Sequence, residues 1–154
     1  MSDINNFQRI GSISNARVGS DFELVAQNFF AKAGFSLIRN HRILIGVGER
    51  TKERRFDLGS DQPAILVECK SHTWTATGNS PSAKLAVWNE AMLYFHLAPS
   101  KYRKILFVHK SLRGKESLAE YYIRCNGHLI PLSVEIWEYD PIKELAIQIS
   151  TSTK

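Results

Sequence analysis

The stretch "RRFDLGSDQPAILVECKSH", Arg54 to His72, holds the feature that decides the fold. Its apolar residues 64–67 lead directly into Glu68-Cys69-Lys70, so two charged side chains stand where a buried strand ends. Side chains of a strand alternate between its two faces, which places Glu68 and Lys70 on one face and Cys69 on the other. The sequence therefore predicts a carboxylate and an ammonium group side by side at the rim of a core.

A second strand is expected just upstream of this one. Residues 56–58 alternate in the same sense, and residues 59–63 have the composition of a tight turn. Two strands paired antiparallel about that turn would bring Asp57 close to Glu68. The hairpin thus predicts that Asp57, Glu68 and Lys70 converge on one point.

Length and composition place limits on the whole chain. With 154 residues, 44% of them hydrophobic, we expect one domain over residues 16–150 behind a flexible N-terminal arm, 1–15. The formal charge of +5 favours a polyanionic partner without identifying one. We expect Cys69 and Cys125 to be buried thiols of an intracellular protein. The polar N-terminus has neither a signal peptide nor a spanning stretch, so we expect a cytoplasmic protein with no membrane contact.

Apolar periodicity predicts an α/β protein with the element order α-β-β-β-α-β-α-β. A polar loop is expected at 46–54, and the alternation of the last strand suits the edge of a sheet. The helices are expected at 19–34, 80–98 and 116–127, and the strands at 35–46, 56–58, 64–70, 104–110 and 132–140.

This order of elements, together with the motif at its centre, resembles the PD-(D/E)xK nuclease superfamily. Ten residues separate Asp57 from the Glu68-x-Lys70 pair, and the likeness covers residues 19–139. Phe56 stands where the family name has proline, at a position that the superfamily holds loosely. The resemblance implies the restriction-endonuclease-like fold, an α/β fold with a central mixed β-sheet flanked by helices.

The resemblance also implies a Mg²⁺-dependent endonuclease acting on DNA, with Mn²⁺ able to replace Mg²⁺. Asp57 and Glu68 would bind the metal, and the backbone carbonyl of Cys69 would complete its protein ligands. Lys70 would orient or deprotonate the attacking water and stabilise the developing charge. A chain of this length would cut two strands as a homodimer or with a partner subunit.

Glu23 has two interpretations that the sequence leaves open. Mrr-type restriction enzymes and archaeal Holliday-junction resolvases carry a glutamate behind a glycine in the first helix, and Gly19 and Glu23 repeat this pattern. In that case Glu23 would be catalytic, as an outer metal ligand or through metal-bound water. Alternatively, Ser20 and Glu23 form an S-x-x-E capping box that stabilises the start of the helix.

Five further residues are candidates for contacts with nucleic acid, and each has a structural alternative. Arg54 and Arg55 belong to a basic segment that would hold phosphates or form a solvated hairpin tip. His72 would contact substrate or serve the structure, and Trp74 would stack on a base or pack at a rim. Lys84 would contact a phosphate or stay a solvated surface lysine.

One weaker pattern is set aside, and rival functions remain. Glu90 and Tyr94 repeat only the spacing of the Q-x-x-x-Y pattern of RecB-related nucleases, so no role is carried over to them. Glu68 and Lys70 would alternatively form a simple ion pair on one face of the strand, which would stabilise the fold by about 0.2–1 kcal/mol. The rival functions are a catalytically silent nucleic-acid-binding or assembly module on the same fold, and an RNA-directed nuclease.

Overall fold

The apolar run at 64–67 forms part of strand β3 (Ala64–Lys70), inside a six-stranded sheet of order β1-β2-β3-β4-β7-β8. The structure is a computed structural model that describes residues 15–149 and 151. The other strands of the sheet are β1 (Ile38–Val47), β2 (Arg50–Asp61), β4 (Arg103–His109), β7 (Val134–Asp140) and β8 (Leu145–Ile149). The helices are α1 (Asn15–Lys32), α2 (Ser82–Leu97), α3 (Leu118–Asn126) and the 3-10 helix η1 (Gly127–Leu129).

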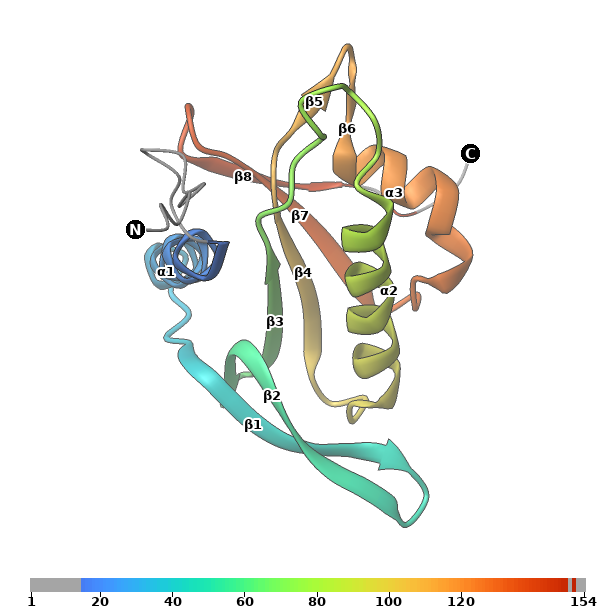
Figure 1. The fold of residues 1–154 in the computed structure, drawn as a ribbon. Helices are drawn as coiled ribbons and strands as arrows, with labels where there is room; N and C mark the ends of the chain where they lie inside the picture. The colour runs from blue at the N-terminus through green and yellow to red at the C-terminus, as the bar shows by residue number, and fades with distance from the viewer. Residues whose placement is uncertain (1–14, 150, 152–154) are drawn as a thin grey trace, which may run out of the picture.

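The sheet is mixed, which agrees with the expected α/β class. Strands β3, β4 and β7 run parallel, whereas β1, β2 and β3 form an antiparallel series and β8 is antiparallel to β7. Parallel neighbours need long crossovers, and the crossovers contain α2 and α3. The carboxyl ends of β3, β4 and β7 therefore lie at the same edge of the sheet, next to the short hairpin of β5 (Leu112–Arg113) and β6 (Glu116–Ser117) (Figure 1).

Helices cover both faces of the sheet and create two separate cores. Helix α1 lies on one face, and α2 and α3 lie on the other (Figure 1). Phe22, Phe30 and Phe107 belong to the core under α1, which also takes Val67 from β3. The core under α2 and α3 takes Leu66 from the same strand. Because neighbouring residues of β3 enter different cores, this strand is buried on both faces.

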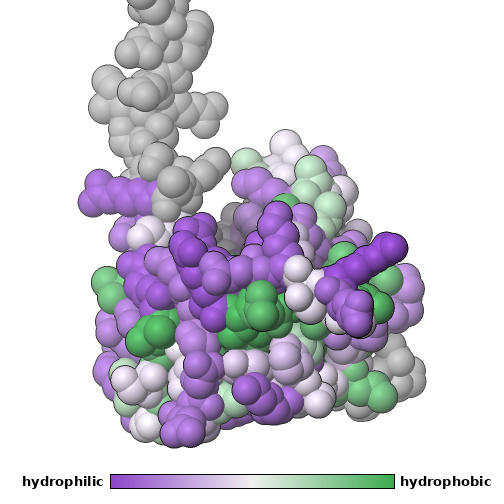
Figure 2. Space-filling view, turned by 90° about the horizontal axis from the view of Figure 1, so that it is seen from below, coloured by the Kyte–Doolittle hydropathy of each residue, from purple (hydrophilic) through white to green (hydrophobic). Residues whose placement is uncertain are grey.

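The hairpin of β1 and β2 is longer than the sequence predicts. The polar segment 46–54 is not a loop, because β2 begins at Arg50 and pairs with β1 from Val47 onward. Ladder hydrogen bonds join backbone groups, so charged side chains do not prevent pairing, and those of residues 50–53 stay exposed. The hairpin projects beyond the rest of the sheet beside the C-terminal end of α2 (Figure 1). Seen from that end, hydrophobic residues gather in the middle of a largely hydrophilic surface (Figure 2).

The turn between β2 and β3 is also tighter than predicted. Gly59 and Ser60 are strand residues, and only Gln62 and Pro63 lie between the paired residues Asp61 and Ala64. Gly59 is required by a close approach, because a Cβ atom there would lie 2.6 Å from the His41 ring. The glycine at position 59 is therefore needed for the close packing of the His41 ring and not for a turn. The predicted antiparallel pairing of the two strands is confirmed.

The expected order of elements is incomplete, because it lacks the β5–β6 hairpin and strand β8, and two further expectations are wrong. The strand expected at an edge, β7, lies between β4 and β8, and the edge strand β8 was not predicted. Leu145 and Ile147 of β8 are exposed, so the sequence there lacks a buried apolar face. Cys125 is exposed on α3 rather than buried, whereas Cys69 is half-buried.

The N-terminal arm predicted at 1–15 lies outside the described residues except for Asn15, which begins α1. Over 15–149 and 151, none of the helices has the length and hydrophobicity that a membrane crossing requires.

Candidate active site

Glu68 and Lys70 lie together on the face of β3 that α2 covers. Alternation puts both on the side of Leu66, and Lys70 Nζ donates a hydrogen bond to Glu68 Oε2 at 3.3 Å. The carboxylate is only 2% exposed, although it stands one residue past the apolar run. The structure thus brings these two predicted residues into direct contact inside the protein.

Asp57 joins them from β2, at the point where pairing between β2 and β3 stops. The last paired residues are Leu58 and Val67. The next residue, Asp57, accepts a hydrogen bond on Oδ2 from the backbone N–H of Cys69 at 2.7 Å. This bond holds the Asp57 carboxylate beside the Glu68-Cys69-Lys70 segment.

The electrostatics of Glu68 are unfavourable for a carboxylate. Burial raises the pKa of Glu68 to about 7, and the negative charge of Asp57 adds to the rise, against the opposing charges of Lys70 and Arg54. Oε1 of Glu68 is buried and has no hydrogen-bond partner among the described residues. The Nη2 atom of Arg54 lies 3.6 Å from this oxygen, in salt-bridge range but too far for a hydrogen bond. An added positive charge would stabilise this pair of carboxylates.

These residues fit a hard divalent cation. Asp57 and Glu68 supply carboxylate oxygens, and the unpaired Oε1 of Glu68 is an available donor. The part of the chain that the structure describes contains no cluster of three or more His, Cys, Asp or Glu side chains able to hold a metal. Mg²⁺ accepts such a sparse set, because it commonly takes one or two carboxylates and fills the rest of its shell with water and substrate phosphate.

Arg54 belongs to this site rather than to an exposed loop. Its guanidinium lies over the ring of Tyr94, 3.7 Å from the ring centroid, and beside Glu68. A hydrogen bond with Glu90 raises the pKa of Tyr94, and the charge of Glu68 contributes to the rise. The Glu90 and Tyr94 pair therefore faces the site from α2. Its i, i+4 spacing was the sequence signal, which we set aside because the first residue differs from the nuclease pattern.

His72 is fixed in position and in protonation state just beyond Lys70. Its Nδ1 accepts a hydrogen bond from Nε1 of Trp88 at 2.9 Å, so the neutral ring carries its hydrogen on Nε2. Burial lowers the pKa of His72 to about 4, with the charges of Lys70 and Lys84 adding to the effect. His72 and Lys84 share the lining of a cavity of about 310 Å³ next to the site. The structure thus places these two nucleic-acid candidates together.

The remaining two candidates lie elsewhere. Trp74 is buried, its indole N–H donates to the backbone oxygen of Ser111 at 3.1 Å, and Arg113 covers its ring at 3.7 Å. This is the packing role that the sequence offered as the alternative to base stacking. Arg55 is exposed on β2 opposite Arg42, on the face that points away from Arg54.

Glu23 is not part of a capping box, because α1 begins at least five residues before Ser20. Gly19, which suggested a helix boundary, lies inside the helix, where a glycine costs only about 1 kcal/mol. The hydroxyl of Ser20 and the carboxylate of Glu23 instead both accept hydrogen bonds from Nη2 of Arg39, at 2.9 and 2.7 Å. Glu23 therefore ties α1 to β1, and its catalytic role stays a prediction.

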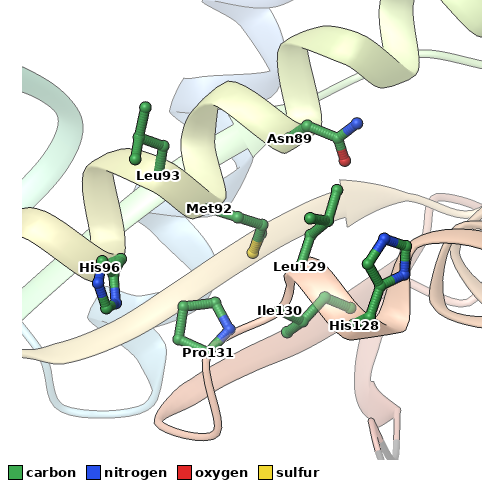
Figure 3. A pocket seen from close by; sticks show the side chains of 8 residues that line it. All are labelled: Asn89, Met92, Leu93, His96, His128, Leu129, Ile130 and Pro131. Atoms are coloured by element: carbon green, nitrogen blue, oxygen red, sulfur yellow. The ribbon is translucent and has the colours of Figure 1, made fainter.

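A separate cavity of about 440 Å³ lies between α2 and η1, away from the carboxylates. Figure 3 shows the side chains that line it, with Met92 and Ile130 at its centre and two histidines at its sides. It shares no lining residue with the site described above, and its lining is mainly apolar. The lining residues are Asn89, Met92, Leu93, His96, His128, Leu129, Ile130 and Pro131.

Comparisons of this chain with protein-family models, with curated proteins and with solved structures find no match. The assignment of a function therefore rests on the geometry and chemistry of the site.

Proposed function

We propose that the protein is a Mg²⁺-dependent endonuclease that hydrolyses DNA phosphodiester bonds, with the PD-(D/E)xK superfamily and its restriction-endonuclease-like fold as the family of best fit. One observation carries the proposal. At the end of a buried strand, the Asp57 carboxylate bonds the backbone N–H next to Glu68 and its charge raises the Glu68 pKa, while Oε1 of Glu68 has no hydrogen-bond partner among the described residues. Lys70 and Arg54 compensate the buried charge only in part, so a bound divalent cation would stabilise the folded protein further.

Each residue of the site then has a chemical task. Asp57 and Glu68 would hold the ion with the Cys69 carbonyl, and the bound ion would supply Lewis-acid activation of the phosphate and of water. Lys70, held by Glu68 at 3.3 Å, orients the attacking water and offers positive charge to the phosphoryl oxygens as negative charge develops on them. Arg54 keeps Glu68 in place from the other side. Cleavage of both strands of a duplex would require a homodimer or a partner subunit.

The test is cleavage of labelled DNA duplexes, flaps, junctions and single strands, and of matching RNA, with Mg²⁺, Mn²⁺ or a chelator. We expect cutting of DNA with either metal and none with the chelator. Asp57→Asn, Glu68→Gln and Lys70→Ala should each reduce the rate by about 100-fold or more, equal to ~2.7 kcal/mol. Asn at position 57 keeps an oxygen for the Cys69 N–H, so the loss would report the charge.

Lys143→Ala is the control, because Lys143 is exposed in the turn between β7 and β8, and it should cut like the wild type. Full activity in any of the three site variants would refute the assigned site. Binding to DNA without cleavage under all conditions would favour the silent module, and cutting of RNA alone would favour the RNA-directed nuclease.

A further inference from the structure

A groove of about 420 Å³ separates the β1–β2 hairpin from the C-terminal half of α2. On the end of the molecule seen in Figure 2, hydrophobic residues gather among hydrophilic ones. The floor of the groove is apolar and its rim is basic. Six residues that characterise the groove are Ile45, Leu97 and Tyr94 on the floor, and Arg50, Lys52 and Arg54 along the rim.

The strand period of two explains why this lining is amphipathic. Residues 50, 52 and 54 share one face of β2, and they pair across the hairpin with residues 47, 45 and 43 of β1. Each basic side chain thus stands next to an apolar one. Glu53 also lines the groove, but its Oε1 is already bound to Arg42 at 3.0 Å. The groove therefore keeps an excess of positive charge beside an apolar surface.

Arg54 connects this groove with the candidate active site. It lines the groove, its guanidinium lies on Tyr94, and its Nη2 is 3.6 Å from Oε1 of Glu68. A chain that follows the basic rim from Arg50 past Lys52 consequently arrives at the two carboxylates. Arg50 and Lys52 are both exposed and stand on the part of the hairpin that projects from the sheet (Figure 1).

We propose that this groove binds a single-stranded segment of nucleic acid, with its phosphates on Arg50 and Lys52 and its bases against the apolar floor. This inference rests on the proposed function, because it makes the groove the path by which the strand reaches Glu68. A single strand exposes the faces of its bases, which cover apolar and aromatic surface while basic side chains follow the backbone. A duplex keeps its bases stacked and would leave the floor of the groove uncovered.

The experiment measures binding of the full-length protein to a labelled single strand of about 20 nucleotides and to its duplex, with Ca²⁺ replacing Mg²⁺. The wild type should bind the single strand more tightly than the duplex. The variant Arg50→Glu/Lys52→Glu should bind the single strand at least about tenfold more weakly, and its log-log salt slope should fall by about 1.4 for two lost phosphate contacts. Its binding to the duplex should change much less.

The matched control is Lys115→Glu/Lys143→Glu, which changes the net charge equally at exposed positions in two other turns. It should bind the single strand like the wild type. An unchanged affinity in the groove variant, or an equal loss in the control or on the duplex, would overturn the groove proposal.

Cleavage with Mg²⁺ is measured separately, so the two proposals fail in different ways. If the wild type cuts DNA while the groove variant binds the single strand normally, the groove assignment fails and the nuclease assignment stands. If the wild type cuts nothing but the groove variant selectively loses single-strand binding, the groove stands as a binding surface and the nuclease assignment fails.

Discussion

The two faces of β3 differ sharply in chemistry, although the same seven residues build both. On the side of α1, Val67 packs into a core of aromatic rings, in which the ring centroids of Phe107 and Phe22 lie 5.5 Å apart. On the side of α2, Leu66 packs into the other core, and Glu68 and Lys70 follow on the same face at the end of the strand. One face is apolar throughout, and the other buries charge at its rim.

The difference shows where the sequence serves something other than stability. Burial of a carboxylate costs free energy unless its partners are complete, and a neutral side chain of similar shape would cost less. Glu68 has Lys70 and Arg54 nearby, yet Asp57 adds a like charge and Oε1 lacks a hydrogen bond among the described residues. Local rules of stability are broken at this rim, which is where functional sites are expected.

The largest effect on stability is expected on the apolar face. Phe107 is fully buried and contacts Phe22, Phe29 and Phe30, so Phe107→Ala should lower the free energy of unfolding by about 3–5 kcal/mol. Urea denaturation measures the loss. Phe107→Leu, which leaves a smaller cavity, is the matched variant and should lose less. Below its unfolding transition Phe107→Leu should cut DNA like the wild type, and a loss of activity without a loss of stability would contradict the division between the two faces.

On the polar face, removal of the Glu68 charge is expected to increase the stability of the metal-free protein. The folded pKa of Glu68, about 7, exceeds its ordinary value of 4.5, so the folded state binds more protons between these values. The contribution of Glu68 to stability should therefore fall as pH rises from about 4.5 to 7, by on the order of 3 kcal/mol. The lowered pKa of His72 makes an opposite contribution in the wild type and in a Glu68 variant alike, so the effect of Glu68 is read from the difference between the two proteins. Glu68→Gln removes this fall, so it should be more stable than the wild type near pH 8 and nearly equal near pH 5.

Thermal unfolding across this pH range, with a chelator present, measures the difference. Addition of Mg²⁺ near pH 8 should stabilise the wild type and not Glu68→Gln, because an ion that binds the folded state alone stabilises it by mass action. A variant less stable than the wild type at every pH would show that Glu68 strengthens the fold, and the contrast between the faces would lose its basis.

The sequence was sufficient for the parts of the fold that depend on buried apolar runs. Strand β3 could be found because residues 64–67 are continuously apolar, and the hairpin with β2 followed from the turn. The tip of the β1–β2 hairpin and strand β8 could not be found, because their side chains are largely exposed and give no continuous apolar pattern. Periodicity reports burial, so it misses strands that bury little.

The candidate site could likewise be predicted only in part. Residues on one strand, such as Glu68 and Lys70, follow from the period of two. Contacts between distant elements do not, because they depend on how helices dock on the sheet. Arg54 was expected either to hold phosphates or to lie in a solvated hairpin tip, and neither interpretation predicts its contact with Tyr94 of α2. Glu23 was expected to be catalytic or to form a capping box with Ser20, and neither interpretation predicts that both residues bind Arg39 of β1.

The smallest effect is expected at Glu23, which lies on the α1 side and whose two interpretations can be separated. Its ion pair with Arg39 is partly exposed, so Glu23→Gln should lower the free energy of unfolding by about 0.2–1 kcal/mol. Ser20→Ala should cost about 1 kcal/mol or less, because Ser20 lies within α1 and loses only one hydrogen bond to Arg39. The Glu23 carboxylate already accepts a hydrogen bond from Arg39 and is therefore not expected to bind the metal. We accordingly expect Glu23→Gln to cut DNA at the wild-type rate without extra Mg²⁺. Cleavage measured across a Mg²⁺ titration separates the two roles. A Glu23→Gln variant that melts normally yet needs much more Mg²⁺ would show that Glu23 belongs to the metal site with Asp57 and does more than link α1 to β1.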